Sequence, residues 1–367
     1  MTKENTALIA LLRLAVGNAD DAVLPTDLNW ERLIETAREQ HVSVIAFDGL
    51  DILYTKHPER HIPIDLPDME SVKMDWYNDI NVLETAYARH ERMIGKIAAK
   101  FRKAGIRTML MKGYGLSLNY PFPPHRPVGD IDIYLYDDKE KGDEIVRGTG
   151  VRVNDVNRHH SSFVLRGIVV ENHRTFLDVD MHPSNARLEK ILTSLVDDNN
   201  TAEIAGETVY LPSPTLNAIY LLRHAGEHFV SDCIQLRHIL DLALFFENNR
   251  TNIDWKLVLN LYELESMMPF YNAIATFCVT YLGFSKDVFQ GMTMVPDMAG
   301  RMIADTFRTT ATGKCPKRSK IMSYGIFKTR MWWHNRWKHS MVYRESLISS
   351  YLALSKKRLG EELVLRK

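Results

Sequence analysis

The middle of this chain of 367 residues has a different residue pattern from its two ends, and this contrast limits the folds that it can adopt. Short apolar runs alternate there with turns, at residues 106–111, 130–135, 162–165 and 168–170. Runs of that length, separated by loops or helix-sized segments, are typical of strands in a small sheet. Arg166-Gly167, between the last two runs, predicts a hairpin turn. We therefore expect a compact α/β unit at residues 106–212.

The regions on both sides of this unit have helical periodicity. Apolar residues recur at helical spacing in residues 29–47, and a longer stripe ends near Gly105. Three prolines within residues 51–69 predict a loop between these helices, and helical patterns resume at Pro214. The predicted fold class is α+β, a small mixed β-sheet core wrapped by N-terminal and C-terminal helices. The expected divisions are an N-terminal helical region (1–105), the α/β core (106–212), a helical region packing on the core (213–312) and basic, aromatic-rich C-terminal helices (313–367).

Cysteine usage and hydropathy indicate a soluble, cytoplasmic protein with no membrane partner. The three cysteines are odd in number and far apart, at Cys233, Cys278 and Cys315, which suits a reducing compartment. The apolar run at residues 7–16 follows Glu4 and contains Arg13, so we expect an amphipathic helix and not a signal peptide. Residues 266–285 carry no charge, but polar residues and a proline interrupt them, which favours a buried core helix over a membrane span.

Charge is distributed unevenly along the chain. Lys plus Arg equals Asp plus Glu at 46 each, yet residues 314–358 contain twelve basic residues and one acidic residue, Glu345. Aromatic residues are interleaved with these cations: Trp332, Trp333, Trp337 and Tyr343. Such a pattern can bind RNA by stacking bases and neutralising phosphates. Because residues 1–313 carry a net charge of −11, we favour a tail that packs on the acidic body, with RNA binding as the alternative.

The segment with the clearest chemical signature is residues 109–135. A predicted strand ends at Lys112-Gly113, a short helix and a proline-rich loop with Arg126 follow, and a second strand carries Asp130 and Asp132. Backbone N–H groups at a helix start can bind a phosphate, with the lysine charge beside them. On the second strand, the period of two places both carboxylates on one face and the intervening isoleucines in the core. Paired carboxylates of this kind can bind hard cations, although a bare Asp-x-Asp can also be a solvated strand start.

These residues resemble a known family. Met111-Lys112-Gly113, Tyr120-Pro121, Arg126 and Gly129-Asp130-Ile131-Asp132 match, in that order, the uncharacterised bacterial nucleotidyltransferase family of the DNA polymerase β-type superfamily. The resemblance continues at residues 159–160, 170–174, 224–228 and 236–241 and covers roughly residues 5–290. One departure from the family pattern concerns the residues expected to bind the triphosphate. Where the superfamily usually has Gly-Ser or Gly-Gly, this chain has Lys112-Gly113-Tyr114.

The resemblance implies a Mg²⁺-dependent or Mn²⁺-dependent transfer of a nucleoside monophosphate from a nucleoside triphosphate (NTP) to an acceptor, with pyrophosphate leaving. The acceptor, a small molecule, protein or RNA, is not implied. The expected catalytic and metal-binding residues are Asp130, Asp132 and Glu171. The expected nucleotide-binding residues are Lys112, Gly113, Arg126, His173, His224 and Arg237.

Three acids that follow the second strand are candidates for the third carboxylate. Glu171 follows the β-branched run Ile168–Val170, whose hairpin should fold against the Asp130 strand. Asp178 and Asp180 come later, where the chain turns toward a helix at Pro183. We therefore favour Glu171, with Asp180 as the alternative.

Other functions stay open at this point. His224 and His228 lie in an H-x-x-E-H pattern, which two helical zinc ligands of a hydrolase would share. Arg237 and Asp241 are four residues apart and can form an intrahelical ion pair instead of binding a substrate. A catalytically silent nucleotide-binding or interaction module with the same fold is the main alternative to an enzyme.

Overall fold

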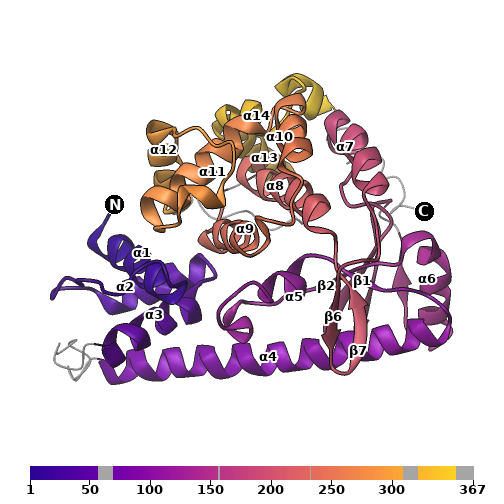
Figure 1. Cartoon of the computed structure of the whole chain (residues 1–367), viewed down its shortest axis with the longest axis horizontal. Helices are drawn as coiled ribbons and strands as arrows, with labels where there is room; N and C mark the ends of the chain where they lie inside the picture. Colours follow the sequence, from indigo (N-terminus) through magenta and orange to yellow (C-terminus); the bar gives the residue numbers. More distant parts are fainter. Residues whose placement is uncertain (57–68, 156–157, 232, 309–320, 353–367) are drawn as a thin grey trace.

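The computed structural model describes residues 1–56, 69–155, 158–231, 233–308 and 321–352. Within these ranges one mixed sheet has a long helix, α4, on one side and helices of the C-terminal half on the other, and α1–α3 lie beside the far end of α4 (Figure 1). The strand order is β3-β4-β5-β2-β1-β7-β6. The strands are β1 (Met109–Leu110), β2 (Ile131–Tyr134), β3 (Val153–Asn154), β4 (His160–Leu165), β5 (Ile168–His173), β6 (Thr201–Ile204) and β7 (Glu207–Tyr210). The predicted α+β class with a mixed sheet is confirmed.

Helices account for the rest of the regular structure. The helices before and within the sheet region are α1 (Lys3–Ala15), α2 (Trp30–Glu39), α3 (Ser43–Lys56), α4 (Met69–Lys103), α5 (Lys112–Ser117), α6 (Lys139–Arg147) and α7 (Pro183–Ser194). Those after it are α8 (Pro214–Ser231), α9 (Leu236–Asn249), α10 (Trp255–Leu264), α11 (Met268–Tyr281), α12 (Pro296–Thr306), α13 (Ile321–His334) and α14 (Arg336–Val342). None of the helices in the described ranges is both long enough and apolar enough to cross a membrane.

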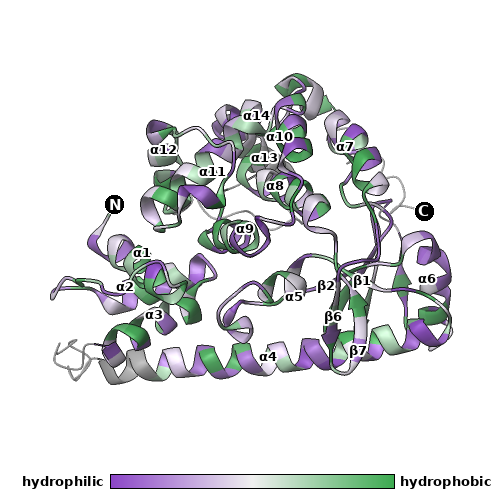
Figure 2. Cartoon of the chain, viewed as in Figure 1, coloured by the Kyte–Doolittle hydropathy of each residue, from purple (hydrophilic) through white to green (hydrophobic). Residues whose placement is uncertain are grey.

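One face of the sheet packs on α4. Ile131 and Ile133 of β2 join Val170 of β5 and Ile94 and Phe101 of α4 in one buried cluster. Hydrophobic and hydrophilic residues alternate along α4, as expected for a helix with one face on the sheet and the other in solvent (Figure 2). The predicted burial of the two isoleucines is therefore confirmed.

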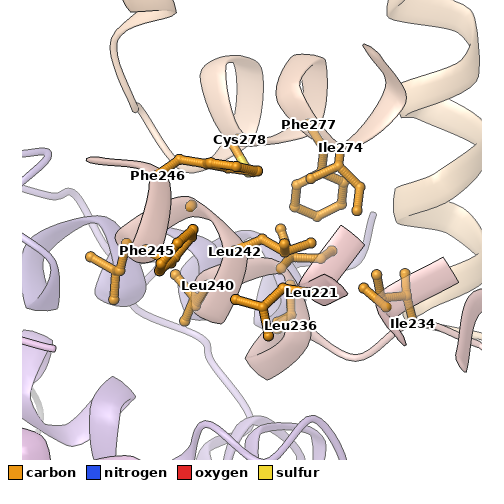
Figure 3. Packing of buried hydrophobic residues seen from close by; sticks show 14 of the residues in the cluster. Leu221, Ile234, Leu236, Leu240, Leu242, Phe245, Phe246, Ile274, Phe277 and Cys278 are labelled. Atoms are coloured by element: carbon orange, nitrogen blue, oxygen red, sulfur yellow. The ribbon is translucent and has the colours of Figure 1, made fainter. Parts of the chain in front are cut away.

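A second and larger core joins the N-terminal helices to the helices after the sheet. Leu242 and Phe246 of α9 lie there on the side that faces Ile274, Phe277 and Cys278 of α11 (Figure 3). Helix α11 corresponds to the uncharged segment 266–285, so the prediction of a buried core helix is confirmed.

Residues with positive φ mark three breaks between elements, one of which the sequence predicted. Arg166 and Gly167 both have positive φ, at 49° and 82°, and form the predicted hairpin turn between β4 and β5. Ala205 and Gly206 form a matching turn, φ 50° and 78°, in the β6–β7 hairpin, which the sequence pattern had not indicated. His41, with φ 54°, separates α2 from α3 where a continuous helical stripe was expected.

Two other expectations need correction or completion. Helix α3 extends to Lys56, into the segment predicted as a loop, and residues 57–68 lie outside the described ranges. In the basic tail, α14 packs into the body, because Lys338 is fully buried and its Nζ lies 2.6 Å from Asp305 Oδ2. The ring of Trp337 lies 5.4 Å from that of Phe229. Residues 309–320 and 353–367, which hold much of the predicted basic stretch, are outside the described ranges.

Candidate active site

The register of β2 and β5 creates a polar face on the sheet opposite α4. These strands are parallel, and Asp132 is paired with Glu171. With side chains alternating along each strand, Asp130 and Asp132 share this face with Glu171 and His173. The neighbouring strand β4 adds His160, whose Cα partner is His173. Four of these residues were expected at the site, and the structure brings them together.

Asp132 is the most enclosed acid of this face, with 3% of its surface exposed. Its Oδ1 accepts a 2.8 Å hydrogen bond from His173 Nε2 and lies 2.9 Å from Lys112 Nζ. Burial alone would raise the pKa of Asp132, but the Lys112 charge and the His173 bond lower it well below its ordinary value. Asp132 is therefore an anion at neutral pH.

Lys112 reaches Asp132 because of the turn at Gly113. Gly113 has φ 48° and ψ −113°, a left-handed backbone that favours glycine. A Cβ there would also lie 3.4 Å from the Asp130 carbonyl oxygen. This geometry differs from the expected helix start, because the regular part of α5 begins only after Gly113. The Lys-Gly pair makes a tight turn that aims the lysine at the second strand.

Glu171 lies beside Asp132, and the two carboxylates form a cluster with His173 in which the ligand atoms are within 4.8 Å of one another. Its oxygens lie 3.4 Å from His160 Nε2 and 3.4 Å from His173 Nε2. Burial raises the pKa of Glu171, and these two histidines outweigh that effect and lower it. Asp180, the alternative third acid, is exposed, and its backbone N–H donates to Asp178 Oδ1 in a turn after β5.

Asp130, directly before β2, is the exposed acid of the group. Partial desolvation, and then the charges of Asp132 and Glu171, raise its pKa. A third carboxylate whose ionisation is opposed by two neighbouring carboxylates would be stabilised by a cation. This face therefore combines three oxygen-donor side chains with a lysine and a glycine turn.

Comparison with known proteins assigns the chain to a family. The chain matches the family described as "Uncharacterised nucleotidyltransferase" over residues 26–283, which is more than half of its length. The chain belongs to this nucleotidyltransferase family. No curated protein and no solved structure matches it. The resemblance inferred from the sequence is thus confirmed for the family, and membership indicates nucleotidyl transfer as the general reaction class.

The side chain of Arg126, which was expected near the triphosphate, is held by contacts within the protein. Its side chain is buried, and its Nε and Nη2 donate to the two carboxylate oxygens of Asp241 at 3.0 and 2.8 Å. Nη1 donates to the carbonyl of Pro127 at 2.7 Å, and Tyr120 adds a 2.8 Å bond to Asp241. Since each guanidinium nitrogen has a protein acceptor, Arg126 holds its loop against α9, and its expected role at the triphosphate stays a prediction.

Two further expected residues lie on the helices that cover the polar face. His224 of α8 is half-buried, and desolvation and then the Lys112 charge lower its pKa well below 6.5. Arg237 of α9 lies 3.9 Å from Asp241, so the predicted intrahelical pair is present but longer than the Arg126 pair. Its buried Nε has no hydrogen-bond partner among the described residues. The covering helices therefore present a neutral imidazole, His224, and a cationic guanidinium, Arg237.

The zinc-hydrolase pattern is not assembled as a metal site. The rings of His224 and His228 lie 4.8 Å apart in an edge-to-face arrangement, and Glu227 accepts a 3.0 Å bond from Asn185. Among the described residues, the clusters with metal-ligand spacing include neither histidine. Gly226 instead allows α14 to pack closely, because a Cβ there would lie 2.6 Å from Val342 Cγ1.

Sequence reasoning missed some members of this environment. Tyr220 of α8 is buried, and it lies close enough to Lys112 for the lysine to affect its pKa. His238 of α9 stacks on His228 with ring centroids 4.4 Å apart. Tyr220 precedes His224 and His228 at four-residue steps, and this spacing on one helix face was a signal that could have found Tyr220.

Proposed function

We propose that this protein is a metal-dependent nucleotidyltransferase that moves a nucleoside monophosphate from an NTP to an acceptor. The acceptor oxygen forms a bond to the α-phosphorus, the bond to the β-phosphate oxygen breaks, and pyrophosphate leaves. The observation that carries this proposal is the side-by-side pairing of Asp132 and Glu171 on one sheet face, with Asp130 at its edge. Family membership supports the same class of reaction.

The donor set fits a hard divalent cation. Asp132 and Glu171 offer carboxylate oxygens within 4.8 Å of each other, and oxygen ligands are what Mg²⁺ and Mn²⁺ prefer. Asp130, Asp132 and Glu171 would hold the metal. Bound there, the metal would neutralise charge on the phosphates during transfer. Among the described residues, His173 and Lys112 both contact Oδ1 of the Asp132 side chain, so we assign its other oxygen, Oδ2, to the cation.

The surrounding side chains suit a polyanionic substrate. Lys112 and Arg237 supply positive charge, and neutral His224 can donate a hydrogen bond without adding charge. We assign these three to the triphosphate, with the Gly113 turn allowing close approach of the backbone. Arg126 is left out, because Asp241 holds its guanidinium.

The proton of the acceptor hydroxyl needs a destination. Glu171 remains ionised at neutral pH because His173 and His160 lower its pKa against the effect of burial. We therefore assign Glu171 to this role, as a metal ligand beside the attacking oxygen or as the base that accepts the proton.

A catalytically silent module is the second candidate, and a specific observation favours it. Lys112 forms an ion pair with Asp132, and His173 donates a hydrogen bond to it, so protein groups compensate the charge of this carboxylate. In a silent protein these pairs would persist when nucleotide binds, and no labelled product would form. RNA as acceptor is not favoured, because the described part of the basic tail packs on the acidic body through Lys338 and Asp305.

The test is transfer of label from an NTP. The protein, α-labelled NTPs and Mg²⁺ or Mn²⁺ would be incubated with a cell extract that is then separated into small molecules, RNA and protein. We expect label in one fraction, lost on chelation and in Asp130→Asn. The matched control is Asp137→Asn, which removes an exposed acid just after the same strand. NTP binding with no label in any fraction would instead establish the silent module.

A further inference from the structure

Three histidines gather at the edge of the polar face, on the side away from the Gly113 turn. His159 directly precedes β4, His160 is the first residue of β4, and His173 is the last residue of β5. Each offers one ring nitrogen, and these nitrogens lie within 4.8 Å of one another. The ring centroids are 5.4 Å apart for His159 and His160, 4.8 Å for His159 and His173, and 5.2 Å for His160 and His173.

One nitrogen of each ring already has an oxygen partner. His173 Nε2 bonds Asp132 at 2.8 Å, His159 Nδ1 bonds Thr175 Oγ1 at 2.6 Å, and His160 Nε2 lies 3.4 Å from Glu171. Histidines that bind metals are typically oriented in this way, with the second nitrogen held by a carboxylate or another oxygen.

The opposite nitrogens of two of these rings are unsatisfied. Among the described residues, Nδ1 of His160 and Nδ1 of His173 are buried and have no hydrogen-bond partner. His173 is only 1% exposed, so water has little access to it. A buried polar atom without a partner is costly, and a metal ion would supply the missing partner.

We propose that His159, His160 and His173 form a nitrogen-rich site for a transition-metal ion of the Zn²⁺ class. Three imidazoles with an open fourth position are a recognised zinc arrangement, whereas Mg²⁺ prefers oxygen ligands. The site is therefore distinct from the carboxylate site proposed above, although the His173–Asp132 bond joins the two. It does not depend on nucleotidyl transfer, because it stands on the histidine cluster alone.

Co²⁺ is the probe, because it replaces zinc and its visible absorption reports nitrogen ligands in a low-coordinate site. Chelator-treated full-length protein would be titrated with Co²⁺, then with Zn²⁺, and separately with excess Mg²⁺. We expect one equivalent of Co²⁺ to bind, Zn²⁺ to displace it, and Mg²⁺ to leave the spectrum unchanged.

Variants locate the site. His159→Ala removes a proposed ligand whose Nδ1 bonds Thr175 Oγ1, and we expect it to weaken Co²⁺ binding at least about tenfold. His160→Ala is the second variant and should act in the same direction. His41→Asn is the matched control, since His41 is exposed and asparagine tolerates its positive φ. Circular dichroism would verify that each variant is folded.

The outcomes separate this inference from the proposed function. Asp130→Asn should lose label transfer but keep the Co²⁺ spectrum. If wild-type protein gives no Co²⁺ absorption, if Mg²⁺ displaces Co²⁺, or if both histidine variants bind like wild type, the three-histidine site is wrong. None of those results depends on whether any nucleotide is transferred.

Discussion

The two faces of the central sheet are made by the same strands and have opposite chemistry. On the α4 face, Ile131 and Ile133 of β2 are 1% exposed and pack with Val170 of β5. On the other face, alternate residues of the same strands are Asp132 and Glu171. Because side chains alternate with a period of two, each strand serves the core and the site at once.

The comparison shows that the two faces depend on different forces. The α4 face is stabilised by apolar burial, which tolerates conservative exchange. The polar face contains a buried anion, Asp132, that is stable only because Lys112 and His173 contact it. Removing one partner there leaves an uncompensated charge, whereas removing a methyl group from the α4 face leaves only a small cavity.

The largest expected effect is that of Asp132→Asn. Turnover should fall by at least about 10²-fold, because a metal ligand is lost. The free energy of unfolding should also fall by about 3–5 kcal/mol, because Lys112 loses its buried counter-charge. Label transfer and urea unfolding measure the two effects.

Asp130→Asn is the matched variant for the same face. Asp130 is exposed and its pKa is raised by the neighbouring acids, so its stability should stay within about 0.5 kcal/mol of wild type. Its turnover should fall as in Asp132→Asn. Near wild-type turnover in either variant with Mg²⁺ would show that the metal assignment is wrong.

The second prediction concerns the opposite face. Ile133→Ala should lower the free energy of unfolding by about 2–5 kcal/mol, because a fully buried side chain leaves a cavity against α4. Ile133→Val should cost only about 0.5–1.5 kcal/mol. Urea unfolding measures both. At a temperature where both variants are folded, the KM for NTP should equal that of wild type. A large change in KM would mean that the faces are not independent.

A third prediction tests where the polar face ends. Arg126→Gln should destabilise the protein by about 3–5 kcal/mol, since Asp241 and Tyr120 would remain buried without the guanidinium. The KM for NTP should change less than threefold. Lys112→Met, in contrast, should raise the KM for NTP at least about tenfold, because one charge-assisted bond to the triphosphate is lost. A tenfold rise in KM for Arg126→Gln in folded protein would return Arg126 to the triphosphate site.

The sequence was sufficient to predict the polar face but not the contacts within it. The alternation of Asp130 to Ile133 and the Arg166-Gly167 turn were local signals, and local geometry decides both features. Arg126 and Asp241 are 115 residues apart in the sequence, so no rule based on local spacing could predict that they pair. The break at His41 was missed for a related reason, because Gln40 is held by the distant Thr306 and Leu236.

The smallest expected effect concerns the loss of folding stability at acid pH. It tests whether a histidine away from the polar face, His339, contributes to that loss. His339 of α14 is buried near His182, Glu345 and Arg223, and desolvation and then the His182 charge lower its pKa to about 4. A lowered pKa means that the unfolded chain binds the proton first as the pH falls. The contribution of His339 to stability is therefore present above about pH 6.5 and is lost between pH 6.5 and pH 4. The difference in unfolding free energy between wild type and His339→Gln should decrease over that range.

His125 provides the control with the opposite sign. It bonds Asp48 of α3 at 2.7 Å and Glu84 of α4 at 3.2 Å, and although burial lowers its pKa, these carboxylates raise it above 6.5. Its contribution is fully present below pH 6.5 and is lost as the pH rises through the folded pKa. The difference between wild type and His125→Gln should therefore decrease as the pH rises above 6.5. Urea unfolding at intervals from pH 4 to pH 9 measures both differences. If His339→Gln runs parallel to wild type below pH 6.5, acid sensitivity there must come from other groups, such as His228 beside the polar face, whose pKa is lowered to about 4.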